Sequence, residues 1–148
     1  MAGNGINPDG AAEAWPEFQD GRFTFQDEAA QLVSHLGGAR PGETVVEAGC
    51  GWGALALHMA RNYGVKVRAF NISRSQLEFA RERAVREGLD NAVEFIEGDY
   101  REIGGNYDAF VSVGMLEHVG PQHYRELGWV MDRTLPANGR GLIHTIGT

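Results

Sequence analysis

The stretch TVVEAGCGWG, residues 44–53, decides the fold of this chain. It begins with β-branched and small apolar residues and then reaches three glycines, Gly49, Gly51 and Gly53. A short apolar run that stops at glycines is typical of a strand buried inside a sheet. Residues 54–63 follow with Ala, Leu and Met, which are good helix formers, and a glycine comes directly after them. The stretch therefore predicts a buried strand, a tight turn and a helix.

The same alternation continues toward the C-terminus. Further strands are predicted over residues 65–70, 93–96, 108–113 and 141–146, and further helices over residues 75–87 and 122–135. Strands that alternate with helices form right-handed crossovers and a parallel sheet. The sequence therefore predicts an α/β, Rossmann-like fold, in which helices cover both faces of a mostly parallel sheet.

Toward the N-terminus the pattern changes. Residues 1–22 show no clear period and are expected to form a flexible arm. Residues 24–36 suit a helix that ends at a pair of glycines. Since 148 residues fit a single domain and no internal repeat is present, residues 23–148 are expected to form one domain.

Composition excludes several classes of function. The net charge of -7 argues against nucleic acid as a partner and limits membrane contact to a peripheral one. Cys50 is the single cysteine, so an internal disulfide is excluded. No apolar run reaches the ~20 residues that span a bilayer, and the start lacks the order of a signal peptide. A cytoplasmic location is expected, and no metal site is predicted.

The glycine turn predicts a cofactor site. In an open parallel sheet, ligands bind at the carboxyl ends of the strands, and glycines let the backbone approach them closely. A dinucleotide would require an acid about 20 residues further on, but Asn71 stands there, so only an NADP site served by Arg68 or Arg74 remains. Glu47 beside the turn favours a ligand that carries an ammonium and a sulfonium, as S-adenosylmethionine does.

Several stretches together resemble one enzyme family. They are PGET (41–44) leading into EAGCGWG (47–53), YGVKV (63–67) followed by NIS (71–73), SVGMLEHVG (112–120) and LIHTI (142–146). In this order and spacing they resemble the cyclopropane-fatty-acyl-phospholipid synthase family, whose members are class I S-adenosylmethionine-dependent methyltransferases. The resemblance runs from about residue 24 to the last residue, although the family usually has Asp in place of Glu47.

The resemblance implies a role for each matching residue. The cofactor would be bound by Glu47, Gly49, Gly51, Trp52, Gly53, Asn71, Gln76, Asp99 and Tyr100. Of these, Gly49 and Gly51 would contact its methionine part, Asn71 and Gln76 its ribose, and Asp99 and Tyr100 its adenine. Glu117, His144 and the backbone of Ile146 would be the catalytic groups, which hold a bicarbonate ion. In the family's reaction, the double bond of an unsaturated acyl chain attacks the sulfonium methyl, and bicarbonate then removes a proton as the ring closes.

Some of these residues also have purely structural interpretations. Ser73 and Gln76 have the spacing of a capping box ahead of a helix. His144 lies within an apolar strand, where a buried, hydrogen-bonded histidine is the usual case.

The chain also departs from the family. It has no cysteine in its N-terminal part, and it ends after the fifth strand, where the family continues with a tyrosine and further strands. The sheet is therefore expected to lack the C-terminal strands and to expose an edge through which copies of the chain could associate. Two alternatives to lipid cyclopropanation stay open: methylation of a small-molecule nitrogen or carbon, and a catalytically silent S-adenosylmethionine-binding module.

Overall fold

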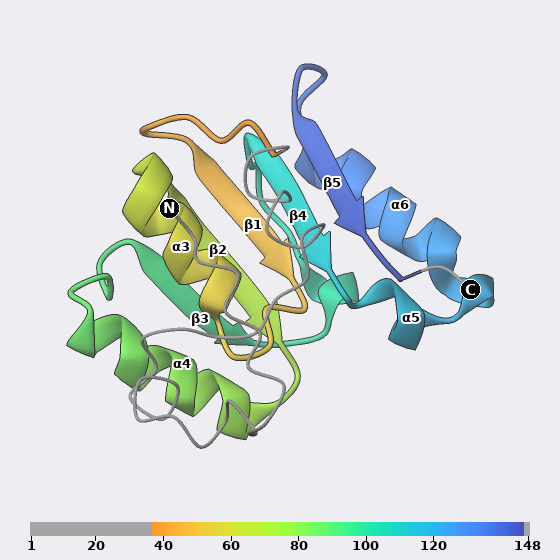
Figure 1. The fold of residues 1–148 in the computed structure, drawn as a ribbon. Helices are drawn as coiled ribbons and strands as arrows, with labels where there is room; N and C mark the ends of the chain where they lie inside the picture. Colours follow the sequence, from red (N-terminus) through yellow and green to blue (C-terminus); the bar gives the residue numbers. More distant parts are fainter. Residues whose placement is uncertain (1–36, 147–148) are drawn as a thin grey trace, which may run out of the picture.

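The computed structural model describes residues 37–146, which contain a single five-stranded parallel sheet (Figure 1). Its strands are β1 (Thr44–Ala48), β2 (Lys66–Asn71), β3 (Val93–Glu97), β4 (Ala109–Val113) and β5 (Arg140–His144). They lie in the order β3-β2-β1-β4-β5. β1 therefore lies at the centre, between β2 and β4, and is buried along nearly its whole length.

Helices lie on both faces of the sheet. They are α3 (Ala54–Tyr63), α4 (Arg74–Arg86), α5 (Leu116–Val119) and α6 (Tyr124–Thr134), with short 3-10 turns at Tyr100–Glu102 (η2) and Pro121–His123 (η3). Figure 1 shows α3 and α4 on the near side of the sheet and α6 on the far side. Since every crossover joins parallel strands, this layering confirms the predicted α/β class and its Rossmann-like arrangement.

Two apolar clusters fill the space between the sheet and its helices. Val45 belongs to the cluster on the side of α3 and α4, and Val46 belongs to the one on the side of α6. Neighbouring residues of a strand point to opposite faces, so the run Val45-Val46 supplies both cores at once. This explains why β1 carries two apolar residues in succession and does not alternate strictly between apolar and polar residues.

The strand order reverses at β1, and this reversal positions the candidate site. The chain moves from β1 to β2 and β3 on one side, then crosses to β4 and β5 on the other. Loops that leave the carboxyl ends of β1 and β4 therefore diverge and leave a crevice between them. The Ser112 hydroxyl, near the end of β4, donates a hydrogen bond of 3.0 Å to the carbonyl of Ala48 and fixes the two strand ends together.

The predicted elements are present, with shifts of one or two residues at most of their ends. The helix predicted over 122–135 is divided: η3 comes first, and α6 begins only at Tyr124. Two short elements, η2 and α5, were not predicted from the sequence. The predicted arm (1–22) and helix (24–36) lie outside the described residues. No helix within residues 37–146 is long and apolar enough to cross a membrane.

Candidate functional site

The glycine turn after β1 crosses over the end of β2. The amides of Gly49 and Cys50 both donate to the carbonyl of Phe70, at 2.9 and 3.0 Å. Gly49, Gly51 and Gly53 all have φ between 53 and 80°, a range that side chains other than glycine rarely adopt. The turn therefore needs glycine at these positions because of its backbone conformation.

The three glycines differ in what surrounds them. A Cβ on Gly53 would lie 2.7 Å from the Phe95 ring, and one on Gly49 would lie 3.0 Å from Met115. A Cβ on Gly51 would meet no protein atom within 4 Å. Gly53 and Gly49 are therefore required by packing as well, whereas Gly51 keeps open a space that the protein itself does not fill.

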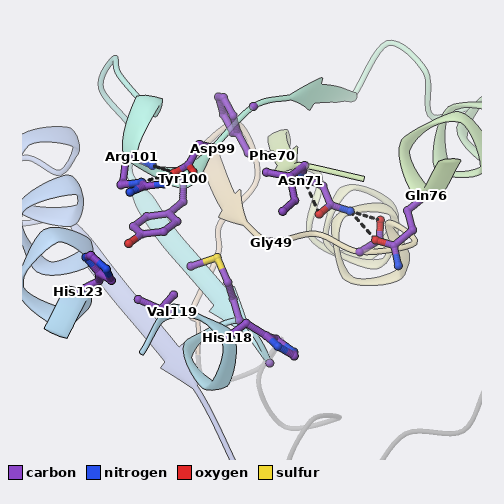
Figure 2. Close-up of a pocket in the computed structure, with 15 residues that line it drawn as sticks. Gly49, Phe70, Asn71, Gln76, Asp99, Tyr100, Arg101, His118, Val119 and His123 are labelled. Atoms are coloured by element: carbon purple, nitrogen blue, oxygen red, sulfur yellow. Dashed lines mark hydrogen bonds and ion pairs between the residues drawn. The ribbon is translucent and has the colours of Figure 1, made fainter. Parts of the chain in front are cut away.

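That space belongs to a cavity of about 490 Å³ at the carboxyl ends of the strands. It is lined by Gly49, Gly51, Phe70, Asn71, Ile72, Gln76, Gly98, Asp99, Tyr100, Arg101, Gly114, Met115, His118, Val119 and His123. Figure 2 shows Asn71 and Gln76 on one side of it and Tyr100, Val119 and His123 on the other. A volume of this size falls within the range of small-molecule and cofactor sites.

Asn71 and Gln76 form a polar pair on the cavity wall. The Asn71 amide donates to Gln76 Oε1 at 2.7 Å and to the carbonyl of Gly51 at 3.2 Å. This pair connects the end of β2 to the glycine turn and to α4. The Gln76 amide nitrogen has no hydrogen-bond partner among the described residues, so it is free to donate to a ligand.

The capping box expected from Ser73 and Gln76 is not formed. Ser73 is the N-cap residue of α4, but its hydroxyl makes no capping bond and instead lies 3.3 Å from the Ser75 hydroxyl. That interpretation is wrong because Gln76 is already engaged with Asn71, on the cavity side of the helix.

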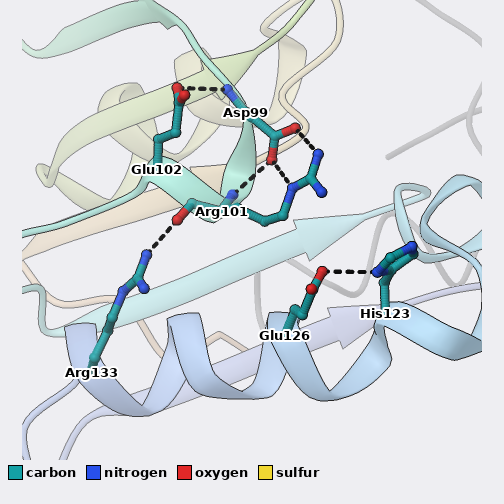
Figure 3. Close-up of polar contacts among 6 residues, drawn as sticks. All are labelled: Asp99, Arg101, Glu102, His123, Glu126 and Arg133. Carbon is teal, nitrogen blue, oxygen red and sulfur yellow. Dashed lines mark hydrogen bonds and ion pairs between the residues drawn. The ribbon is translucent and has the colours of Figure 1, made fainter.

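Asp99 and Tyr100 follow β3 and line the cavity beside Arg101 (Figure 2). The Asp99 carboxylate accepts hydrogen bonds from the Arg101 amide at 2.9 Å and from its guanidinium at 2.8 and 2.6 Å (Figure 3). These bonds lower the pKa of Asp99 to about 2, so the carboxylate is ionised at neutral pH. Glu102 closes a capping box with Asp99, which fixes the start of η2.

Three residues predicted to bind the cofactor do not line the cavity: Glu47, Trp52 and Gly53. Glu47 is only 2% exposed and lies on the face of β1 that α3 covers. Its carboxyl accepts a hydrogen bond from the Ala56 amide in the first turn of α3, and its Oε2 has no partner among the described residues. Burial raises the pKa of Glu47 to about 8. The Glu47 side chain thus lies in the core and not at the cavity wall, because alternation along β1 points it to the side of the sheet that α3 covers.

Trp52 makes its contact outside the cavity lining. Its indole is 53% exposed and makes an edge-to-face contact with Phe79 of α4, with ring centroids 5.3 Å apart. Gly53 is packed against Phe95 and Ala80 and serves the contact between helix and sheet.

The predicted catalytic residues are close together at the ends of β4 and β5. The Ile146 amide donates to Glu117 Oε1 at 2.6 Å, and this hydrogen bond lowers the pKa of Glu117. His144 is half-buried, and its Nδ1 has no partner among the described residues. The expected alternative of a hydrogen-bonded core histidine therefore does not describe this nitrogen.

Several cavity residues were missed by sequence reasoning. Phe70, Ile72 and Gly98 follow or end β2 and β3, and Gly114, Met115, His118, Val119 and His123 follow β4. Their position at the carboxyl ends of predicted strands is the feature of the sequence from which they could have been predicted. The apolar residues among them carry no reactive or charged group that would indicate a binding site.

Comparison with known proteins agrees with this geometry. The family model of the mycolic acid cyclopropane synthetases matches residues 24–148. The chain belongs to this family. It is 48% identical over 109 residues to the cyclopropane-fatty-acyl-phospholipid synthase of Escherichia coli K12, which covers 74% of this chain and 28% of that protein. It is 32% identical over 132 residues to cyclopropane mycolic acid synthase 3 of Mycobacterium tuberculosis H37Rv, which covers 87% of this chain and 46% of that one.

Solved structures of the family have the same fold. A cyclopropane synthase from Mycobacterium tuberculosis superposes with a TM-score of 0.73 at 25% identity, covering 78% of this chain and 40% of that chain. A mycolic acid cyclopropane synthase complexed with SAH and CTAB superposes with a TM-score of 0.71 at 26% identity, covering 85% and 45%. This chain thus spans less than half the length of these relatives.

Proposed function

We propose that this chain binds S-adenosylmethionine in the cavity and takes part in methyl transfer to the double bond of an unsaturated acyl chain. The observation that carries the proposal is the cavity at the reversal of strand order, which lies within the residues that the family model matches. A related synthase has been solved with SAH, the demethylated form of this cofactor, which supports the choice of ligand.

The cavity residues fit such a cofactor. Gly51 leaves a space that a Cβ would occupy, so a ligand can approach the backbone of the turn. The free amide nitrogen of Gln76 and the Asn71 side chain that holds it offer polar groups for a ribose. Tyr100 presents a ring and Asp99 a carboxylate at the opposite wall, where an adenine would find stacking and an acceptor.

The chain's own contribution to catalysis would be alignment. When bound, S-adenosylmethionine supplies a methyl group that its sulfonium already activates. Met115 and Val119 line the cavity with apolar side chains, which favours an acyl chain over water beside the cofactor. Holding donor and acceptor in one geometry lowers the entropic part of the barrier.

The described residues do not by themselves fit a bicarbonate ion. The Ile146 amide is already donated to Glu117, and the lowered pKa of Glu117 keeps its carboxylate negatively charged, which would repel an anion. Among the described residues, His144 Nδ1 is a buried nitrogen without a hydrogen-bond partner, and one such nitrogen does not make an anion site. The proposed function therefore assigns no role to a bicarbonate ion.

The test is an incubation of the 148-residue chain with methyl-labelled S-adenosylmethionine and phospholipid vesicles. Vesicles with monounsaturated acyl chains are expected to gain label, whereas vesicles with saturated chains, the matched control, are expected to gain none. If the cofactor binds but neither kind of vesicle is labelled, lipid methylation by this chain is wrong. Labelling of small amines in place of lipid would favour the alternative acceptor class.

A further inference from the structure

The two strands on either side of the cavity, β1 and β4, separate before they end. Their parallel pairing stops at Glu47 opposite Val111. By contrast, the pairing of β1 with β2 continues to Ala48, and the pairing of β4 with β5 continues to Val113. The last residues of β1 and β4 therefore belong to two diverging pairs of strands, and the cavity lies where these pairs diverge.

Each pair of strands holds one wall of the cavity by its own backbone hydrogen bond. The Gly49 amide donates to the carbonyl of Phe70 at 2.9 Å, which joins the glycine turn to β2. The Gly114 amide donates to the carbonyl of His144 at 3.0 Å, which joins the loop after β4 to β5. Neither of these two bonds runs from one pair of strands to the other, so they do not set the distance between the walls.

The side chain of Ser112 connects the two pairs. Its hydroxyl is fully buried and donates to the carbonyl of Ala48 at 3.0 Å, one residue beyond the last paired residues of β1 and β4. Ala48 directly precedes Gly49 of the glycine turn, and Ser112 is three residues before Met115. The two walls are close there, because a Cβ on Gly49 would lie 3.0 Å from the Met115 side chain. The Ser112 hydroxyl therefore lies where it can fix the spacing of the walls.

We propose that Ser112 is a positioning residue, whose hydrogen bond to Ala48 holds the glycine turn and the loop after β4 at the spacing that accepts S-adenosylmethionine. The identity of the ligand rests on the proposed function, whereas the role of the hydroxyl rests on the strand ends. Without this bond, the walls would populate other spacings as well, and the apparent affinity falls with the fraction of chains that stay competent. Since one buried neutral hydrogen bond contributes a modest net free energy, the affinity should fall by roughly three- to tenfold.

Calorimetry on the full 148-residue chain tests this role. Ser112→Ala is expected to weaken S-adenosylmethionine binding by this factor. Thr134→Val is the matched control and is expected to keep the affinity, because the Thr134 hydroxyl is also fully buried but donates to the carbonyl of Val130 at 2.7 Å, outside the cavity lining. Ser112→Cys, whose thiol is a weaker donor, is expected to bind with intermediate affinity. Unchanged affinity in Ser112→Ala, or equal weakening in Thr134→Val, would overturn the proposal.

Hydrogen exchange of the ligand-free chain is a second measurement that needs no cofactor. Ser112→Ala is expected to speed amide exchange in the peptide that covers residues 48–53, since the turn then loses its connection to β4. Thr134→Val is expected to leave this peptide unchanged, and unchanged exchange in folded Ser112→Ala would contradict the role of the hydroxyl. If the unsubstituted chain binds no S-adenosylmethionine, the proposed function is wrong, and hydrogen exchange alone then decides whether Ser112 holds the walls.

Discussion

Gly51 and Gly88 adopt similar backbone conformations, with φ of 53° and 69°, and a Cβ at either position would meet no protein atom within 4 Å. Of these two glycines, Gly51 lines the cavity and Gly88 does not. Replacing either glycine by alanine is expected to cost roughly 1–2 kcal/mol of stability because of the left-handed backbone. Gly51→Ala is expected to weaken S-adenosylmethionine binding by about tenfold or more, which corresponds to about 1.4 kcal/mol, and Gly88→Ala is expected not to weaken it. Calorimetry measures both affinities, and equal affinities would mean that the ligand does not approach Gly51.

Glu47 predicts a pH dependence of stability. Burial raises its pKa from 4.5 to about 8, so between these values the folded state keeps a proton that the unfolded state releases. The free energy of unfolding should therefore fall as pH rises from about 5 to 8, by up to about 1.4 kcal/mol per pH unit. Glu47→Gln is expected to flatten this slope, since it keeps the acceptor for the Ala56 amide.

Urea unfolding at several pH values measures the slope. Glu78→Gln makes the same substitution at an exposed position on α4 and serves as the control. A slope that survives in Glu47→Gln and disappears in the control would contradict the role of the buried carboxyl.

Glu47 also shows a limit of sequence reasoning at this scale: its place in the motif is visible, but the direction in which β1 turns its side chain follows only from the packing of α3.

At the scale of elements, the 3-10 turn η2 and the helix α4 differ in how their first residues are capped. Asp99 caps η2 with its side chain, whereas Ser73 begins α4 without a capping bond. Asp99→Ala is therefore expected to lower the stability of the cofactor-free chain by about 1 kcal/mol, and Ser73→Ala by less than about 0.5 kcal/mol. Thermal unfolding compares the two variants. A larger loss for Ser73→Ala would mean that its hydroxyl caps the helix in solution.

The long elements could be predicted because their signals are local. β1 is a short apolar run that ends at glycines, and α3 is a run of helix formers, so both are visible in single windows of sequence. The short elements η2 and α5 could not be predicted in this way. η2 depends on the bonds of Asp99 with Arg101 and Glu102, and on Arg133 of α6, which donates to the carbonyls of Arg101 and Ile103. Tertiary contacts of this kind have no sequence period.

At the scale of the whole molecule, the site follows from the order of the strands. Asn71, Asp99 and Gly114 are separated by many residues in sequence but come together because β2, β3 and β4 all end at the same edge. The sequence therefore predicts which residues gather there once the strands are assigned. It does not predict which of them engage each other, as Asp99 does with Arg101 and Glu117 with Ile146, because those pairings depend on the loops.

The residues at the same edge favour one of the two cofactors that the glycine turn allows. An NADP site would need a free cation near the end of β2, but Arg68 is bound to Glu94 and Tyr107, Arg74 is bound to Glu97, and neither arginine lines the cavity. S-adenosylmethionine at about 100 times its dissociation constant is expected to stabilise the fold by about 2.7 kcal/mol and to raise the thermal midpoint by on the order of 10 °C. NADP at the same concentration is expected to leave the midpoint unchanged, since Arg68 and Arg74 are both engaged with other side chains and neither lines the cavity. Differential scanning calorimetry measures both shifts, and a shift with NADP alone would reverse the assignment of the cavity, because the glycine turn by itself accepts either ligand.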